Sequence, residues 1–217
     1  MNIPVGGYPR RNVPAALIIL GATVVAYFLQ MSASLEALRL FALWPLGTPE
    51  AIRFSDVGVL ETGFRPWQLV SYGFLHGGFG HLFFNMFALF MFGLPVEQLW
   101  GTRRFVIFYF VCLVGAALVQ LLVAAIAGEV YPTIGASGAV FGLLLAYGMM
   151  FPNSTIVLLI PPIPIKAKYF VIGYGVLTLV FGMTGAMPGV AHFAHLGGML
   201  FGFGLIVHWS RQAGRRR

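Results

Sequence analysis

Five long stretches of this 217-residue chain contain no charged residue, and they limit what the chain can fold into. They cover residues 12–35, 66–96, 105–128, 130–165 and 169–210. A membrane-spanning helix needs about 20 mainly apolar residues, and each stretch can supply one. Only 9% of all residues are charged, against roughly 25% in a soluble domain. The sequence therefore predicts an all-α membrane protein, with a single domain over residues 1–217 and its core at about 13–210.

Two of these stretches are too long for one helix. Residues 151–164 contain four prolines, which end a helix, so the fourth helix is predicted at about 136–150. The glycine- and proline-containing segment 183–190 divides the last stretch into a fifth and a sixth helix. The first three helices are predicted at about 13–31, 70–94 and 105–128. We therefore expect six transmembrane helices.

The distribution of basic residues supports this count. Ten of the thirteen lie in four clusters, namely Arg10 and Arg11, Arg103 and Arg104, Lys166 and Lys168, and Arg211, Arg215, Arg216 and Arg217. Six helices place all four clusters on one side, and basic loops favour the cytoplasm. The net charge of +7 is thus explained by a topology with both termini cytoplasmic. We expect a lipid bilayer around the protein and no nucleic-acid partner.

The connection between the first two helices, about residues 32–68, is long and rich in apolar side chains. They are Phe41, Leu43, Trp44, Leu46, Phe54, Phe64 and Trp67. This content is too apolar for a disordered loop, and tryptophan favours the membrane interface. We expect a folded loop that is partly embedded in the outer side of the membrane.

The rare polar residues of the predicted bundle collect at one depth. The second, fourth and sixth helices all run from the outer to the inner side, and their first halves carry His76, His81, Asn85, Ser137, His192 and His195. Polar residues in membrane helices are costly and usually face the protein interior. Because three separate segments agree, we expect a polar site that opens to the outer side.

Ser137 begins the fourth predicted helix, within the segment Gly135-Ala136-Ser137-Gly138. A helix N-terminus offers free N–H groups and the positive end of the helix dipole, which suit a developing oxyanion. The alternative is a capping serine on a glycine-rich packing face, and the short motif by itself does not exclude it.

His195 on the sixth helix is the candidate base for Ser137. Two glycine pairs with G-x-x-x-G spacing would let the fourth and sixth helices pack closely, namely Gly138 with Gly142 and Gly198 with Gly202. If these faces meet, Ser137 and His195 come within hydrogen-bonding distance, as a nucleophile and its base require. No acidic residue is placed to orient the histidine, so a dyad is predicted. His192 lies on the same helix face, and spacing alone leaves it as an alternative base.

His81 and Asn85 are four residues apart on the second helix and point the same way. Imidazole N–H and amide NH₂ groups are donors, so the pair can complete an oxyanion hole with the backbone N–H of Ser137. Hydrogen bonds between helices are the structural alternative.

These segments together resemble the signature of the rhomboid intramembrane serine proteases. They are His81-Leu-Phe-Phe-Asn85, Gly135-Ala-Ser137-Gly138 and Ala194-His195-Leu-Gly-Gly198, and the resemblance extends over residues 13–210. It implies the basic six-helix bacterial form, in a bacterial plasma membrane, with Ser137 as nucleophile and His195 as base. It also implies an oxyanion hole of His81, Asn85 and the Ser137 N–H, with Gly135 as a further contributor. Transmembrane proteins are the implied substrates, and one copy of the chain suffices.

Further residues follow or depart from that family pattern. His76 resembles a further family histidine near the entrance, and Glu97 with Gly93 and Gly101 resembles a structural glycine–glutamate pattern of the family. Where the family often has Trp-Arg in the first loop, this chain has Trp67-Gln68.

Three other functions fit the sequence less well. A transporter would usually carry carboxylates at mid-membrane, and the sequence has none there. A metal site could use His76, His81, His192 and His195, but their spacing lacks the H-E-x-x-H pattern of helical zinc sites. A catalytically inactive relative would typically lack the serine or the histidine. We therefore expect a serine protease that needs no metal and no cofactor.

Overall fold

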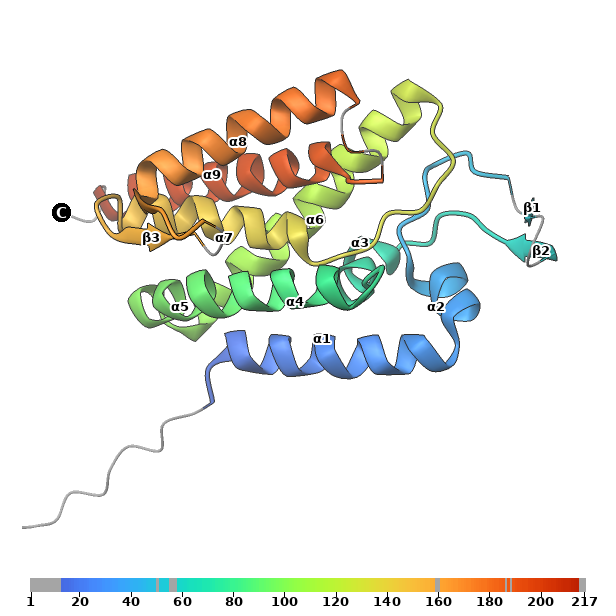
Figure 1. Cartoon of the computed structure of the whole chain (residues 1–217), viewed down its shortest axis with the longest axis horizontal. Helices are drawn as coiled ribbons and strands as arrows, with labels where there is room; N and C mark the ends of the chain where they lie inside the picture. Colours follow the sequence, from blue (N-terminus) through green and yellow to red (C-terminus); the bar gives the residue numbers. More distant parts are fainter. Residues whose placement is uncertain are drawn as a thin grey trace, which may run out of the picture.

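The computed structural model describes residues 13–49, 51–54, 58–158, 161–185, 187 and 189–214. Arg10, Arg11, Arg215, Arg216 and Arg217 of the predicted basic clusters lie outside these residues. The helices are α1 (Ala15–Ser32), α2 (Ser34–Phe41), α3 (Gln68–Ser71), α4 (Phe79–Ala88), α5 (Leu94–Trp100), α6 (Thr102–Ala127), α7 (Ser137–Met150), α8 (Ala167–Thr184) and α9 (His192–Gly214). In Figure 1 the long helices form a bundle, with α6 crossing behind α7 and α9.

Within the described residues, five segments are long and apolar enough to cross a membrane. They are α1, the α4–α5 segment Phe79–Trp100, α6, α8 and the His192–Gln212 part of α9, while α7 is a shorter apolar helix. The prediction of a mostly helical, multi-pass membrane protein is therefore confirmed. The prediction that the chain is entirely α-helical is wrong in detail, because the two longest connections each contain a short antiparallel hairpin.

The first hairpin pairs β1 (Ala51–Phe54) with β2 (Gly58–Glu61) in the connection after α2. The second pairs β3 (Thr155–Val157) with β4 (Pro164–Lys166) between α7 and α8. Both have only three or four residues per strand. Strands this short carry too little alternation of polar and apolar residues for the sequence to predict them.

The predicted helix at about 70–94 is divided in the structure. After α3 and the 3₁₀ turn η1 (Tyr72–Phe74) the chain becomes extended at Leu75, and α4 begins only at Phe79. The adjacent glycines Gly77 and Gly78 explain this break, because glycine disfavours helix interiors. A π-helical turn, η2 (Leu89–Gly93), then separates α4 from α5, just before Pro95, which has no N–H for the preceding turn. His76 consequently lies in the short non-helical turn of residues 75–78 and not on a helix.

The first loop is folded over most of its described length. The side chains of Leu43 and Trp44 are buried, and Leu43 forms an isolated antiparallel bridge with Thr133, shortly before Ser137. Gln68, at the position where the family often has arginine, is also fully buried. Its side-chain carbonyl accepts the backbone N–H groups of Trp44 at 3.3 Å and Arg65 at 3.1 Å. The neutral amide of Gln68 therefore organises this loop. The expected position of the loop in the outer side of the membrane stays a prediction.

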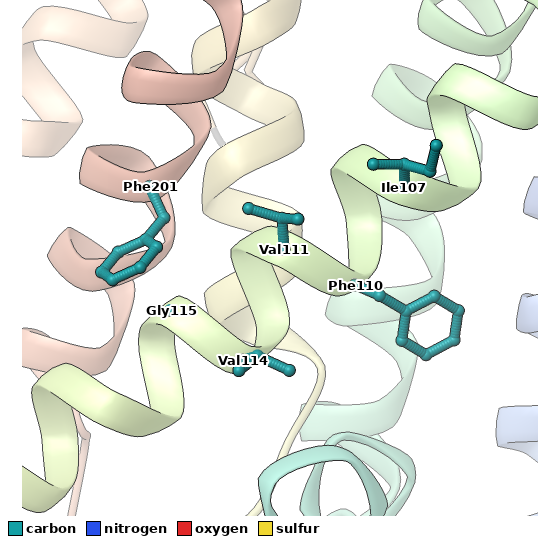
Figure 2. A pocket seen from close by; sticks show the side chains of 6 residues that line it. All are labelled: Ile107, Phe110, Val111, Val114, Gly115 and Phe201. Carbon is teal, nitrogen blue, oxygen red and sulfur yellow. The ribbon is translucent and has the colours of Figure 1, made fainter. Parts of the chain in front are cut away.

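Helix α6 is the centre of the core and packs against both α7 and α9. Its buried side chains are Phe105, Phe108, Tyr109, Cys112, Leu113, Gly115, Ala116, Ala117, Gln120, Leu121 and Ala124. Between α6 and α9 an apolar groove opens to the outside, and Figure 2 shows Phe201 of α9 beside Gly115 of α6 at this groove. A Cβ added at Gly115 would collide with the Phe201 side chain. Small residues on α6 thus allow α9 to pack close to the core.

Candidate active site

Ser137 and His195 meet where α7 begins. The hydroxyl Oγ of Ser137 and the Nε2 of His195 are 2.8 Å apart, which is a hydrogen-bonding distance. Ser137 is the first residue of α7, so its side chain lies at the positive end of that helix. His195 lies in the first turn of α9 and is buried, with 9% of its surface exposed. The two residues are 58 positions apart in sequence, so only the packing of α7 on α9 brings them together.

Glycine at the contact between α7 and α9 makes this approach possible. A Cβ added at Gly198 would collide with the backbone carbonyl of Gly138, and one added at Gly142 would lie 3.1 Å from the Gly198 carbonyl oxygen. Gly198 therefore meets α7 directly, whereas a Cβ at Gly138 or Gly142 would first collide with Ala116 or Cys112 of α6 and only then meet α9. A Cβ at Gly202 would also meet α6, at 2.9 Å from the Phe108 ring and 3.0 Å from the Cys112 sulfur. The role of Gly202 is to bring α9 close to α6.

Phe141 orients the imidazole of His195. The two rings are stacked, with centroids 4.2 Å apart and planes only 8° from parallel. Phe141 follows Ser137 by four residues, so both project from one face of α7 toward α9. The stack continues to Tyr174 of α8, at 4.9 Å between ring centroids. Sequence reasoning missed Phe141, although its spacing from Ser137 was visible.

Gly135 brings His81 close to the serine. Its φ of +124° is a conformation that favours glycine. A Cβ at this position would lie 2.8 Å from both Cε1 and Nε2 of His81, and 3.8 Å from the Ser137 hydroxyl. The Nδ1 of His81 accepts the backbone N–H of Gly77 at 3.3 Å. Since Nδ1 is an acceptor, the proton of the neutral ring is assigned to Nε2, one of the two ring atoms nearest Gly135.

Asn85 lies one turn further along α4 and is 6% exposed. Its Nδ2 donates to the backbone carbonyl of His81 at 2.8 Å. This bond uses one of the two amide N–H groups and leaves the other for a further acceptor. Asn85 thus lies on the same helix as His81, and one of its two amide N–H groups is bonded to the backbone of that helix.

Two further histidines, His76 and His192, flank this arrangement. His192 is buried, and its ring centroid is 6.2 Å from that of His195. The hydrogen bond to the Ser137 hydroxyl that fits a base is made by His195. His76 is 1% exposed, and its Nε2 accepts the backbone N–H of Ala136 at 3.5 Å. In the described part of the chain, no group of three or more His, Cys, Asp or Glu residues is arranged to hold a metal ion.

Glu97, near the end of the α4–α5 segment, is not directed to His195. Its carboxylate accepts the backbone N–H groups of Ala15 and Ala16 at 2.8 and 2.9 Å, and the Thr102 hydroxyl at 2.8 Å. It therefore caps the N-terminus of α1. The arrangement at Ser137 is a serine–histidine pair whose imidazole is oriented by an aromatic ring.

Comparison with known proteins identifies the family of this chain. Residues 63–212 match the Rhomboid domain family. The chain is 33% identical over 168 residues, 73% of its length, to RHOMBOID-like protein 4 of Arabidopsis thaliana, of which the match covers 39%. It is 30% identical over 167 residues, 75% of its length, to Rhomboid protein 1, mitochondrial, of Saccharomyces cerevisiae, of which 47% is covered.

A bacterial relative is similar over a shorter region. The chain is 31% identical over 140 residues, 63% of its length, to Rhomboid protease GluP of Bacillus subtilis, of which the match covers 25%. The matched region thus spans less than half the length of each of these three relatives. Because the family match covers well over half of this chain, the predicted resemblance is confirmed. This protein belongs to the rhomboid family.

Proposed function

We propose that this protein is an intramembrane serine endopeptidase that cleaves peptide bonds in or next to transmembrane segments of other membrane proteins. The observation that carries the proposal is the 2.8 Å pairing of Ser137 and His195 at the N-terminus of a helix inside an apolar bundle. Family membership supports it. Neither the serine at a helix start nor the buried histidine would indicate hydrolysis alone, but their pairing supplies a nucleophile and a base.

The proposed reaction has two stages. His195 Nε2 takes the hydroxyl proton as Ser137 Oγ attacks the substrate carbonyl carbon, and the protonated imidazole then gives this proton to the leaving amine as the peptide bond breaks. Water, deprotonated by His195, then attacks the acyl-enzyme ester and releases the carboxylic acid and the serine hydroxyl. The stacked Phe141 keeps the imidazole in line with the hydroxyl through both stages.

Three groups are proposed to stabilise the negatively charged oxygen formed at each stage. The backbone N–H of Ser137 is at the free N-terminus of α7. His81 contributes its Nε2–H beside Gly135, and Asn85 contributes its second amide N–H. Donors fixed in place before the reaction need no reorganisation as charge develops, which is the main advantage of an oxyanion hole.

The membrane arrangement that we propose has six spans, in which the shorter helix α7 is added to the five longer segments. Helix α7 has 14 residues and is about 21 Å long at roughly 1.5 Å per residue. The hydrocarbon core of a bilayer is about 30 Å thick. If α7 ends at the inner boundary, Ser137 lies below the outer surface and the site opens outward. With six spans both termini lie on the same side, which we propose to be the cytoplasm. The proposed membrane is the plasma membrane of a bacterium.

The proposed substrates are transmembrane proteins, and a single copy of the chain contains every proposed catalytic group. A helical substrate must unwind locally, because a helix shields its carbonyl groups from attack. The family resemblance implies small residues at the cleavage site and helix-weakening residues after it. No cofactor takes part in this chemistry, and no nucleic acid is expected as a partner.

The test is cleavage of a purified single-pass membrane protein in detergent, with wild type, Ser137→Ala and a parallel wild-type reaction containing EDTA. Labelling by a fluorophosphonate probe, which reacts with activated serines, reports on Ser137 without a substrate. We expect wild type to cleave and to be labelled with or without EDTA, and Ser137→Ala to do neither while keeping its thermal stability. Cleavage lost in EDTA would favour a metal site among the histidines. Cleavage that persists in Ser137→Ala would refute the assignment.

A further inference from the structure

The turn that carries His76 is attached to α1 by one side chain. Gln30, in the last turn of α1, donates from Nε2 to the backbone carbonyl of His76 at 2.9 Å. Its Oε1 accepts the backbone N–H of His76 at 3.0 Å. One amide therefore satisfies both backbone groups of a residue that lies 46 positions away. Because Leu75–Gly78 is irregular, this pair of bonds replaces those that a helix would have supplied.

From this turn, His76 reaches the residue before the proposed nucleophile. Its buried ring accepts the backbone N–H of Ala136 at 3.5 Å, and Ala136 is the N-cap residue of α7. Only a neutral imidazole can accept a hydrogen bond. Burial, with a smaller effect of His81, lowers the pKa of His76 to about 4, so the ring is neutral near pH 7. His76 can thus hold the Gly135–Ala136 peptide plane in one orientation.

The same turn also acts on His81. Gly77 directly follows His76, and its N–H donates to His81 Nδ1 at 3.3 Å. The rings of His76 and His81 contact each other edge to face, with centroids 4.9 Å apart. A shift of the turn would therefore alter both the peptide before Ser137 and the position of the proton on His81.

We propose that Gln30 is a positioning residue for proteolysis. Through the His76–Gly77 turn it orients the peptide that precedes Ser137 and keeps His81 in the tautomer that donates from Nε2. This inference rests on the proposed protease function, because it assigns a purpose to the groups that Gln30 orients. Helix α1 contributes no proposed catalytic side chain, but it is connected through this turn to the proposed oxyanion-binding groups.

The test compares two variants that each loosen α1 at one end. Gln30→Met removes both bonds to His76 with little change in side-chain size. Glu97→Gln weakens the cap at the other end of α1, where the carboxylate accepts the N–H groups of Ala15 and Ala16. For each variant kcat and KM for the single-pass substrate, the rate of fluorophosphonate labelling and the thermal midpoint are measured.

We expect Gln30→Met to lower kcat and the labelling rate about tenfold with KM unchanged, the pattern of an interaction needed in the transition state. Glu97→Gln should lose at least as much thermal stability and keep kcat within about twofold of wild type. Equal losses of kcat in the two variants, or full activity of Gln30→Met, would overturn the inference.

Nitrogen-15 NMR of His81, assigned with a His81→Asn variant, supplies a readout that does not depend on turnover. We expect the Nε2–H tautomer in wild type and a mixture of tautomers in Gln30→Met. An unchanged His81 signal in folded Gln30→Met would contradict the proposed connection.

If Gln30→Met does not fold, the next link is tested with His76→Leu, which loses the acceptor for Ala136, and His76→Gln, which keeps one. We then expect activity to fall in the first and to be largely retained in the second; equal activity would overturn the inference.

The outcomes also separate this inference from the proposed function. Wild-type protein that neither cleaves the substrate nor reacts with the probe would overturn both. Cleavage that depends on Ser137 but is indifferent to Gln30 would overturn the positioning role alone.

Discussion

Adding one methyl group at Gly198 should separate the two halves of the dyad. A Cβ there would collide with the Gly138 carbonyl oxygen and would lie 3.3 Å from the Gly138 Cα. Both obstacles belong to the backbone, so no side chain can rotate away. Restoring ordinary van der Waals contact requires α7 and α9 to move apart by roughly 1.5 Å, since contacting heavy atoms are about 3.5 Å or more apart.

That displacement acts directly on the proposed reacting groups. Gly138 follows Ser137, and Gly198 lies one turn after His195, so most of the movement is transmitted to the dyad. The Oγ to Nε2 distance of 2.8 Å would then exceed about 3.5 Å, where a hydrogen bond is lost. A misplacement of about 1 Å can cost on the order of 100-fold in rate. We expect Gly198→Ala to lose about that much in kcat/KM, and about 1–3 kcal/mol in stability from overpacking.

Gly204→Ala on the same helix is the matched control, because a Cβ at Gly204 would have no neighbouring atom within 4 Å. It introduces the same chemical change away from the α7 contact, and we expect unchanged cleavage. Both variants are assayed for cleavage of the single-pass substrate and for thermal unfolding. Activity of Gly198→Ala within about threefold of wild type would show that the helices accept the methyl group without separating, and would refute this reasoning.

Three further predictions concern the side chains around the dyad. Phe141→Leu removes the ring stacked on His195, a contact worth about 0.5–1.5 kcal/mol, so kcat should fall roughly 2- to 13-fold with little change in KM; an unchanged kcat would exclude an orienting role. Asn85→Ala should slow single-turnover cleavage less than His195→Ala does, because Asn85 is one of several donors while His195 is the sole proposed base; an equal or greater loss would reverse these assignments. Because burial lowers the pKa of His76 from 6.5 to about 4, the unfolded chain takes up a proton at this residue between those values and the folded protein does not. Stability should therefore decrease as the pH falls from about 6.5 to 4, by up to roughly 3 kcal/mol for this group; thermal unfolding of wild type should show a steeper pH dependence over that range than His76→Gln, and parallel curves would contradict it.

The sequence was sufficient for the central pairing because local rules combined to predict it. The spacing of Gly138 with Gly142, and the position of Gly198 one turn after His195, predicted a close helix contact. Ser137 was predicted near the start of a helix at about 136–150, because the prolines of residues 151–164 end that helix. The long uncharged stretches defined the helices within a few residues wherever no glycine pair interrupted them. The family resemblance then added the residues of α4, whose own spacing was ambiguous.

The parts that could not be predicted depend on contacts between distant segments. Gln30 is a single uncharged polar residue near the end of a helix, and its partner is the backbone of His76, so no pattern of residue types marks the contact. The division of the second predicted helix had a visible cause in Gly77 and Gly78, but the long apolar run concealed it. The turn created there is the element that places His76 against Ala136. The break in the helix expected at about 70–94, which the sequence analysis did not predict, therefore lies next to the site.

The dyad also explains why packing has an unusually direct influence on this site. In a serine–histidine–aspartate triad an acid fixes the imidazole by a hydrogen bond. Here the only ring contact of comparable closeness to His195 in the described structure is the stacked Phe141, at 4.2 Å between centroids. Stacking fixes the plane of a ring more strongly than its rotation within that plane, so the remaining alignment depends on how far α9 is from α7. That distance is set by Gly198 against the Gly138 backbone. The small residues of the helix contact are thus part of what aligns the proposed base with the proposed nucleophile.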